Sequence, residues 1–522
     1  MPGQKVISLM MAAAMAAATG AARAQQTSGQ TQSQTPSQGK DSGSEKPNPD
    51  FHMSPAQAKE LFSSVDTIMQ FASDDSKLPL KHDVKRKLTT RVAVEKYLVD
   101  KMKDDKDAKR MERSEIVLKK FGLLDRDFQL EPFLVSLLKE QIAGYYDSKT
   151  KTVNLLDWIE PDAQKPVLAH ELTHALQDQH VNLEKWEDQT SEDLSHNAAD
   201  DLHHIATDEE DTAREAVLEG QAMAVFVDYG LAPAHRSLRS SPGLVQNLTD
   251  NMSDDSDSPI LSRAPLLLQA SLLFPYKEGL KFEATLLGDK GPEGAFAAVL
   301  DHPPTSSYEI MNPRAYERGA TVPVLHMPDV HPVLDAAYNP YDIGVMGELD
   351  VQIVSQLFGG DQASALLTPA WDGGIYYASQ KKDAPDKAST ASIALMYLSQ
   401  WKSPQAAALF SKMYADELGK KYSNVQRDAT SEEADGEQVY KTSEGPVLIV
   451  VSGRDVFVSE SYDLTTARKL QLLMLGAQQG SGEQQVAANR LSTGDGLTAS
   501  MVHFMAGCGM MKAATAEVHV RP

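Results

Sequence analysis

His170-Glu171-Leu172-Thr173-His174 is the stretch of this 522-residue chain that constrains the fold most strongly. On a helix, residues four apart lie one turn above each other on the same face, so the two histidines can bind one metal ion through their imidazole nitrogens. Glu171 then lies beside the first ligand, where its carboxylate can take a proton from water. Pro166 suits the first turn of such a helix, and apolar residues recur around the motif with helical spacing, at Leu168, Leu172, Ala175 and Leu176. The pattern predicts a helix that carries two zinc ligands; the alternative is a chance occurrence of this short pattern on a helix without a metal.

A catalytic zinc site normally has three protein ligands and one position open to water, so a third ligand must come from elsewhere in the chain. Glu219 is the first candidate, because it lies on the flank of a second predicted helix, residues 212–229. The buried stripe of this helix is predicted from its small and apolar residues: Ala213, Ala216, Val217, Gly220, Ala224 and Val227. Gly220 removes side-chain bulk where this helix must approach the first one, and Glu215 is expected nearer the solvent side.

Two alternatives remain for the third ligand. His180 follows His170 at the spacing of the longer pattern H-E-x-x-H-x-x-G-x-x-H, but Gln177 stands at the glycine position. Ten residues of continuous helix rise about 15 Å, so His180 could reach the same ion only after a sharp turn, which Gln177 does not favour. Glu219 could also be an ordinary surface carboxylate. The prediction is zinc on His170, His174 and Glu219, with His180 as the competing third ligand.

The histidine pair around Glu171, followed by a glutamate on a later helix, resembles the gluzincin group of zincin-like metallopeptidases. The strings at residues 170–180 and 219–222 are similar to those of a set of bacterial exported proteins of this type, as are Phe274-Pro275-Tyr276, Pro303-Pro304-Thr305-Ser306-Ser307 and Trp371-Asp372-Gly373-Gly374. The resemblance covers residues 140–380 and implies a zincin-like fold that hydrolyses peptide bonds, with Glu171 acting as base and then as acid.

The same resemblance implies an extended substrate that pairs with an edge strand, for which residues 151–156 are nominated. The chain departs from the better-known gluzincins in its long acidic insertion between His174 and Glu219. No oxyanion-stabilising Tyr, His or Arg can be assigned from the sequence.

The predicted fold class is α+β, a predominantly helical zincin-like fold with a small sheet and a C-terminal accessory region. Helical spacing predicts three or four helices over residues 51–140, and β-prone runs predict a hairpin over residues 144–155. A strand pair is predicted over residues 445–458 and a helix over residues 465–475. Trp371-Asp372-Gly373-Gly374 is interpreted first as a turn.

Changes in composition divide the chain into five predicted parts. They are a signal peptide (1–24), a disordered linker (25–50), a zincin-like domain with the metal site (51–255), a C-terminal region that packs on the cleft (256–460), and a C-terminal helix with a flexible tail (461–522).

The N-terminus has the features of an export signal. Lys5 precedes an apolar stretch, residues 6–18, and Ala22-Arg23-Ala24 forms a small-x-small cleavage site. The apolar stretch is shorter than the roughly 20 residues that span a bilayer, so we expect cleavage and no stable membrane insertion afterwards. The only cysteine is Cys508, and a chain without disulfides suits a bacterial periplasm or the medium. The predicted location is therefore periplasmic or extracellular.

The charge balance limits the partners. The chain has 73 acidic residues against 50 Lys and Arg, a net charge of −23 that repels nucleic-acid phosphates. We expect a peptide or protein substrate and no nucleic acid, while the oligomeric state is left open. Two other functions also remain open: a catalytically silent zincin-like binding or envelope-assembly protein, and a metallohydrolase of non-peptide amides.

Three further histidines, His196, His203 and His204, lie in an acidic segment predicted as a loop, residues 187–211. They could bind a second cation together with neighbouring carboxylates. Their spacing matches no known site, so a solvated loop is the favoured interpretation.

Overall fold

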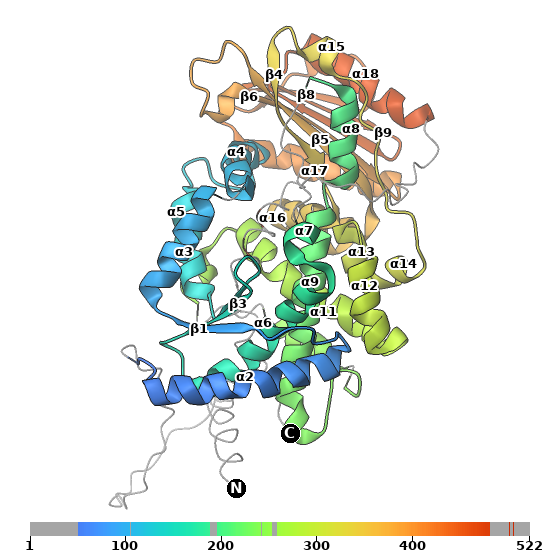
Figure 1. The fold of residues 1–522 in the computed structure, drawn as a ribbon. Coiled ribbons are helices and arrows are strands. Elements are labelled where there is room, and N and C mark those ends of the chain that lie inside the picture. Colours follow the sequence, from blue (N-terminus) through green and yellow to red (C-terminus); the bar gives the residue numbers. More distant parts are fainter. Residues whose placement is uncertain are drawn as a thin grey trace, which may run out of the picture.

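The computed structural model describes residues 51–104, 106–187, 196–241, 243–252 and 258–480, together with Met501 and Met505. The predicted signal peptide and linker lie outside these residues, as do nearly all of the predicted tail and the segment 253–257 at the predicted domain boundary. Within the described ranges the architecture is mostly helical α+β with two sheets (Figure 1). This agrees with the predicted α+β, predominantly helical class. The division into domains stays a prediction.

The region before the hairpin contains four helices, as expected: α2 (Pro55–Ser76), α3 (Arg91–Asp104), α4 (Lys106–Phe121) and α5 (Leu130–Gln141). Ser54 caps α2, because its hydroxyl accepts a hydrogen bond from the Gln57 backbone while the Gln57 side chain accepts one from the Ser54 backbone. Figure 1 shows α2 lying across the bottom of the molecule, where it packs against the central helices.

The small sheet has the strand order β1-β3-β2. β3 (Thr152–Leu156) pairs antiparallel with β2 (Tyr145–Asp147), which confirms the predicted hairpin, and parallel with β1 (Lys85–Thr89). The nomination of residues 151–156 as an edge strand is wrong, because β1 covers the second side of β3. The polar sequence Lys-Arg-Lys-Leu-Thr of β1 gave no strand signal, and its partner lies far along the chain. Among the strands that the structure describes, β1 and β2 are the two edges of this sheet.

Three helices form the centre of the molecule: α6 (Pro161–Val181), α9 (Glu210–Leu231) and α11 (Leu266–Ala295). α6 carries the H-E-x-x-H motif, but it begins at Pro161, so the expectation that Pro166 lies in the first turn is wrong. Gln164 in the first turn accepts a hydrogen bond from the backbone N–H of Leu156 and donates one to the carbonyl of Leu156, which ties the helix start to β3.

α9 is buried along almost its whole length, because α2, α6 and α11 all pack against it. The stripe predicted from small and apolar residues is buried as expected. Glu215 is also buried, at 4% exposure, so its expected place near the solvent side is wrong. The helix that approaches Gly220 is α11 and not α6: a Cβ at Gly220 would lie 2.3 Å from the carbonyl oxygen of Gly279.

The acidic segment predicted as a loop contains a helix, α8 (Ala198–Thr207), which follows the short α7 (Leu183–Glu187). Asn197 caps α8 by accepting a hydrogen bond from the Ala199 backbone. One face of α8, with Ile205, is buried against the second sheet. The loop prediction is therefore wrong over residues 198–207, where tertiary packing stabilises a charged helix.

The second sheet is antiparallel throughout, with the order β4-β5-β6-β10-β9-β8-β7. Its strands are β4 (Tyr338–Val345), β5 (Trp371–Lys381), β6 (Ile393–Trp401), β7 (Gln426–Arg427), β8 (Glu437–Thr442), β9 (Gly445–Ser452) and β10 (Asp455–Glu460). The predicted strand pair over residues 445–458 is confirmed as β9 and β10. The turn expected at Trp371-Asp372-Gly373-Gly374 is wrong: these residues begin β5, and the register shifts there between Trp371 and Gly374.

Helices cover both faces of this sheet (Figure 1). Tyr376 packs with Phe121 of α4, and Tyr397 packs with Phe410 of α17 (Pro404–Lys421). On the opposite face, Tyr377 belongs to a second apolar cluster that includes residues of α8 and of α18 (Leu464–Gly480). α18 confirms the helix predicted over residues 465–475.

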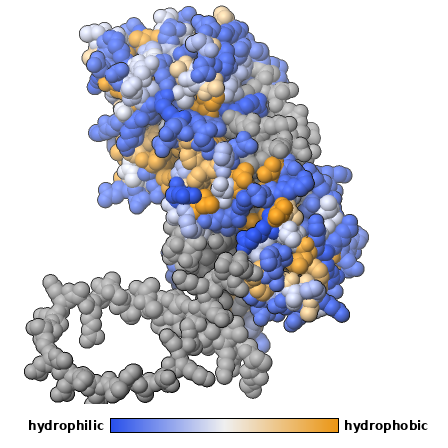
Figure 2. All heavy atoms as spheres, turned by 90° about the vertical axis from the view of Figure 1, so that its left-hand side faces the viewer, coloured by the Kyte–Doolittle hydropathy of each residue, from blue (hydrophilic) through white to orange (hydrophobic). Residues whose placement is uncertain are grey.

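The remaining elements connect these layers. They are α10 (Gly243–Asn251), α12 (Ala297–Asp301), α13 (Ser307–Met311), α14 (Pro313–Glu317), α15 (His331–Leu334), α16 (Glu348–Leu367), and the 3-10 turns η1 (Ala232–Ala234), η2 (Leu261–Arg263), η3 (Thr368–Ala370), η4 (Thr390–Ser392) and η5 (Ala429–Ser431). Among the described helices, none combines the length and the apolar character that crossing a bilayer requires. On the face drawn in Figure 2, hydrophilic residues predominate and hydrophobic ones are scattered among them.

Candidate metal centre

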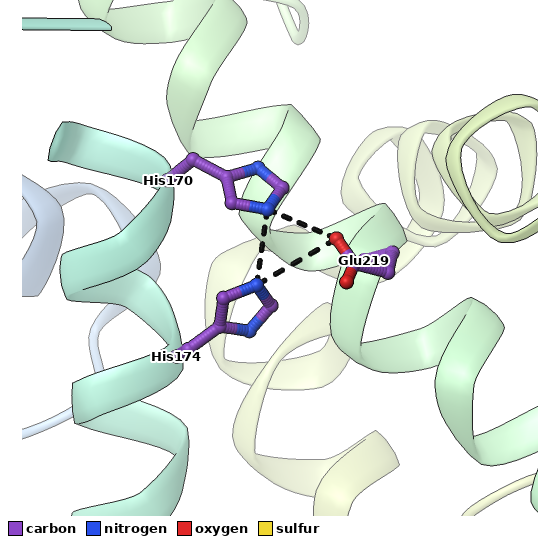
Figure 3. Close-up of side chains that lie close together, drawn as sticks. All are labelled: His170, His174 and Glu219. Carbon is purple, nitrogen blue, oxygen red and sulfur yellow. Dashed lines mark hydrogen bonds and ion pairs between the residues drawn. The ribbon is translucent and has the colours of Figure 1, made fainter. Parts of the chain in front are cut away.

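His170 and His174 lie one turn apart on α6 and direct their Nε2 atoms to the same point (Figure 3). The two Nε2 atoms are 3.0 Å apart, and the ring planes cross at 80°. This is the arrangement expected from the i, i+4 spacing on a helix.

Glu219 of α9 completes the group. Its Oε2 atom lies 2.9 Å from His170 Nε2 and 3.6 Å from His174 Nε2. Two ligand atoms of a tetrahedral zinc with bonds near 2.1 Å are about 3.4 Å apart, so the observed triangle is close to the size that one zinc ion requires. The structure therefore brings together the three side chains named from the sequence, in a group that could hold a metal ion.

The three side chains are largely removed from solvent, with exposures of 1% for His170, 13% for His174 and 4% for Glu219. Within the described residues, Glu219 Oε2 is buried and lies close to the Nε2 atoms of His170 and His174 without a hydrogen bond of good geometry to either. A metal ion at this point would bind the buried oxygen directly in place of that imperfect pairing. The donor set of two imidazoles and one carboxylate is one that zinc takes in proteins, so these residues fit the ion.

Gln177 holds His174 in the orientation that the group needs. Its amide oxygen lies 2.8 Å from His174 Nδ1, and its amide nitrogen donates to the Leu218 carbonyl and to Gln221 Oε1, at 3.1 and 2.9 Å. An Nδ1–H that donates to Gln177 leaves the lone pair on Nε2, facing Glu219. Gln177 thus fills the position where the longer metal-binding pattern has glycine, and it connects α6 to α9.

The electrostatics of the group differ between the two histidines. Burial lowers the pKa of His170 to about 4, which keeps this imidazole neutral. Burial opposes the charge of His174 as well, but the carboxylates of Glu219 and Glu171 outweigh it and raise its pKa to about 9. Burial also disfavours the charged form of Glu219, but the neighbouring His174 and His170 outweigh this effect and lower its pKa to about 2. With no ion bound, a charged His174 therefore pairs with a charged Glu219.

Glu171 lies on α6 between the two histidines and is 2% exposed. Burial raises its pKa to about 7, with smaller opposite effects from His174 and the Tyr146 backbone. Gly144, which precedes β2, lies against this side chain: a Cβ at Gly144 would be 3.6 Å from Glu171 Cγ. The carboxyl group is thus placed beside the end of β2, with a pKa suited to proton transfer near neutral pH.

Tyr276 is a neighbour of the site that sequence reasoning did not assign. It lies on α11, is fully buried, and its ring stacks beside that of His170 at 6.3 Å between centroids. Burial and the nearby carboxylates, Glu219 first, raise its pKa well above the ordinary value, so the hydroxyl stays protonated. The only sequence signal for it was Phe274-Pro275-Tyr276, one of the strings that carried the resemblance.

His180 does not take part in the group. α6 continues without a turn to Val181, and His180 Nε2 lies 3.1 Å from Asp301 Oδ1 at the surface. His180 as the third ligand is therefore wrong, for the reason that an unbroken helix carries it too far along the axis.

The three histidines of the acidic segment have separate surroundings. His203 is exposed on α8, and His204 Nε2 lies 3.4 Å from Asp208 Oδ1. His196 lies 3.0 Å from Asp335 Oδ1, far away in the sequence.

No protein-family model, curated protein or solved structure matches this chain. The buried group of His170, His174 and Glu219 is thus the feature of the described residues that points to a function.

Proposed function

We propose that the protein is an exported zinc-dependent metallopeptidase of the gluzincin type, with zinc on His170, His174 and Glu219 and with Glu171 as general base. The convergence of His170 Nε2, His174 Nε2 and Glu219 Oε2 within 3.6 Å of one another carries the proposal. Three ligands from two helices leave a fourth tetrahedral position for water or substrate, as catalytic zinc sites do.

The chemistry that zinc supplies in such a site is polarisation of a carbonyl oxygen and activation of water for attack. Glu171 supplies the proton transfer: its carboxylate accepts a proton from water and later donates it to the leaving amine. Its raised pKa, about 7, makes both transfers feasible at neutral pH. Gln177 keeps the His174 imidazole in the tautomer that leaves Nε2 free.

The substrate strand is proposed to pair with β2, in place of the edge strand expected from the sequence. β2 is an edge strand of the small sheet within the described residues, and the Gly144 that precedes it lies against Glu171. An extended peptide added to this edge would pass beside the proposed base. His174, the most exposed ligand at 13%, marks the side from which a substrate would enter.

The enclosure of the site favours one rival, a zincin-like binding protein without turnover. Exposures of 1% for His170 and 4% for Glu219 are those of a closed site. Peptide hydrolysis requires that the surrounding elements open to admit a substrate, whereas a silent metal site does not.

A comparison of the wild type with Glu171→Gln separates the two functions. Both proteins should hold zinc on His170, His174 and Glu219, because the substituted residue is not a ligand, and both are assayed for zinc content and for cleavage of casein and a peptide library. We expect cleavage by the wild type and a loss of at least about 100-fold in the variant, the usual contribution of a general base. His180→Ala, a change of a non-ligand histidine on the same helix, is the control and should cleave normally. Zinc in the wild type without cleavage of any peptide would favour the binding protein. Absence of zinc would rule out the peptidase and also the metallohydrolase of non-peptide amides.

A further inference from the structure

A second group of metal-binding side chains lies away from the first, between α8 and α15. It consists of His196, just before α8, with His331 and Asp335 at the two ends of α15. The Nδ1 atom of His196 is 3.0 Å from Asp335 Oδ1, and the Nδ1 atom of His331 is 3.3 Å from the same oxygen. The two rings are close, with 5.9 Å between centroids. Three potential ligand atoms therefore converge on one point.

The ring of His331 is held in place through the nitrogen that does not face the cluster. Its Nε2 atom lies 3.1 Å from Oδ2 of Asp201, a carboxylate of α8 that is only 3% exposed. A hydrogen bond from Nε2–H to Asp201 puts the lone pair of His331 on Nδ1, on the side of Asp335 and His196. Metal-binding histidines typically donate their other ring N–H to a carboxylate in this way. This buried carboxylate is an observation independent of the ligand cluster, and it gives His331 the tautomer that a metal needs.

The group joins parts of the chain that are far apart. His196 and Asp201 belong to the segment between the two helices of the first site, while His331 and Asp335 directly precede β4 of the large sheet. Figure 1 shows α8 lying against that sheet with α15 near its upper end. An ion bound by both segments would close a long loop of the chain and hold α8 on the sheet. Because the unfolded chain would lose this ion, its binding would raise the free energy of unfolding.

We infer that His196, His331 and Asp335 form a second divalent metal site, which takes zinc and fastens α8 to α15. Two imidazoles and a carboxylate oxygen are ligands that zinc prefers, and the remaining position is open to water because His196 lies at the surface with 52% exposure. This inference goes beyond the proposed peptidase and does not depend on it. It also gives a role to His196 that the acidic sequence around it did not reveal.

The test measures zinc per chain in the full mature protein, after removal of metal and dialysis against buffered free zinc. We expect about two ions in the wild type and about one in His196→Asn and in Asp335→Asn. Both substituted side chains are partly exposed, at 52% and 37%, so the variants should fold, which circular dichroism checks. His203→Asn, at an exposed histidine of α8, is the matched control and should keep about two ions. Asp201→Asn should lower the affinity of this site about tenfold or more, since it removes the carboxylate behind His331.

A His170→Gln/His174→Gln variant isolates the second site. If the inference is right, this protein still binds about one ion, zinc raises its midpoint of thermal unfolding, and adding His196→Asn abolishes both effects. If the folded double variant binds no zinc, or if His196→Asn leaves its zinc unchanged, the second site does not exist. The two proposals fail separately: a wild type with one ion that is lost in His196→Asn and Asp335→Asn but kept in His170→Gln/His174→Gln would support this site and contradict the first one.

Discussion

Gln177 shows how a single residue can prepare the proposed metal site. Its amide joins the His174 ring on α6 to the backbone and side chains of α9, which carries Glu219. In the sequence, Gln177 stands where the longer metal-binding pattern has glycine, and it indicates only that the helix does not turn sharply there. In the structure, the Gln177 side chain supplies the acceptor for His174 Nδ1–H, which a glycine at this position could not do.

Gln177→Met keeps the side-chain length but removes the acceptor, and we expect it to weaken zinc binding at the first site about 10–100-fold. Gln177→Glu retains an oxygen for His174 Nδ1–H and should keep most of the affinity, although it loses the donated bonds to α9. Zinc titration with a competing chelator, in a His196→Asn background, measures the first site alone. An equal loss of zinc affinity in both variants would show that Gln177 acts through packing and not through its hydrogen bond with His174.

At the scale of elements, the site depends on how closely α9 and α11 cross. A Cβ on Gly220 would lie 2.3 Å from Gly279 O, and a Cβ on Gly279 would lie 2.2 Å from Ala216 O. The backbones are thus in contact directly after Glu219. The crossing places the proposed ligand and Tyr276, which belongs to α11, on the same side of α6.

Gly220→Ala should therefore destabilise the protein by about 3 kcal/mol or more, because two backbones would have to separate. Gly230→Ala, on the same helix, is the matched control: a Cβ there meets nothing within 4 Å, and the change should be neutral or stabilising by up to about 1 kcal/mol. Urea unfolding of the metal-free proteins measures both. A Gly220→Ala protein as stable as Gly230→Ala would contradict the close crossing.

The sequence predicted those elements whose signals are local. The i, i+4 histidines, the small-residue stripe of α9 and the hairpin of β2 and β3 each depend on neighbouring residues. β5 and β6 were missed because both of their faces are buried, as the opposite packing of Tyr376 and Tyr377 illustrates, so no alternation of polar and apolar residues marks them. β1 and α8 were missed because long-range pairing and packing stabilise polar sequences there.

At the scale of the whole molecule, α2 and α9 meet near two acidic residues, Asp75 and Asp228. Burial, together with the charge of Asp228, raises the pKa of Asp75 to about 7. Burial raises the pKa of Asp228 to about 6, although it accepts a hydrogen bond from the Leu238 backbone. Carboxyl groups whose pKa is higher in the folded than in the unfolded chain stabilise the fold below pH 4, and this contribution is lost as the pH rises through 6 to 7.

Asp75→Asn removes one of these groups, so we expect the variant to gain stability relative to the wild type on going from pH 5 to pH 8, by about 1–2 kcal/mol. Urea unfolding measures the free energy of unfolding of both proteins at both pH values. In the difference between the two proteins, the contributions of the other titrating groups cancel. Asp74→Asn, at the exposed neighbouring position, is the control. A difference between Asp75→Asn and wild type that does not change with pH would show that Asp75 is ionised in the folded protein.

The central claim is that one zinc ion lies between α6 and α9. A crystal of the zinc-loaded protein, measured on both sides of the zinc absorption edge, tests it directly through the anomalous difference map. The account predicts a peak about 2.0–2.2 Å from His170 Nε2, His174 Nε2 and a carboxylate oxygen of Glu219. A fully loaded crystal with no peak between these three side chains, or with a peak there that Glu219 does not contact, would contradict it.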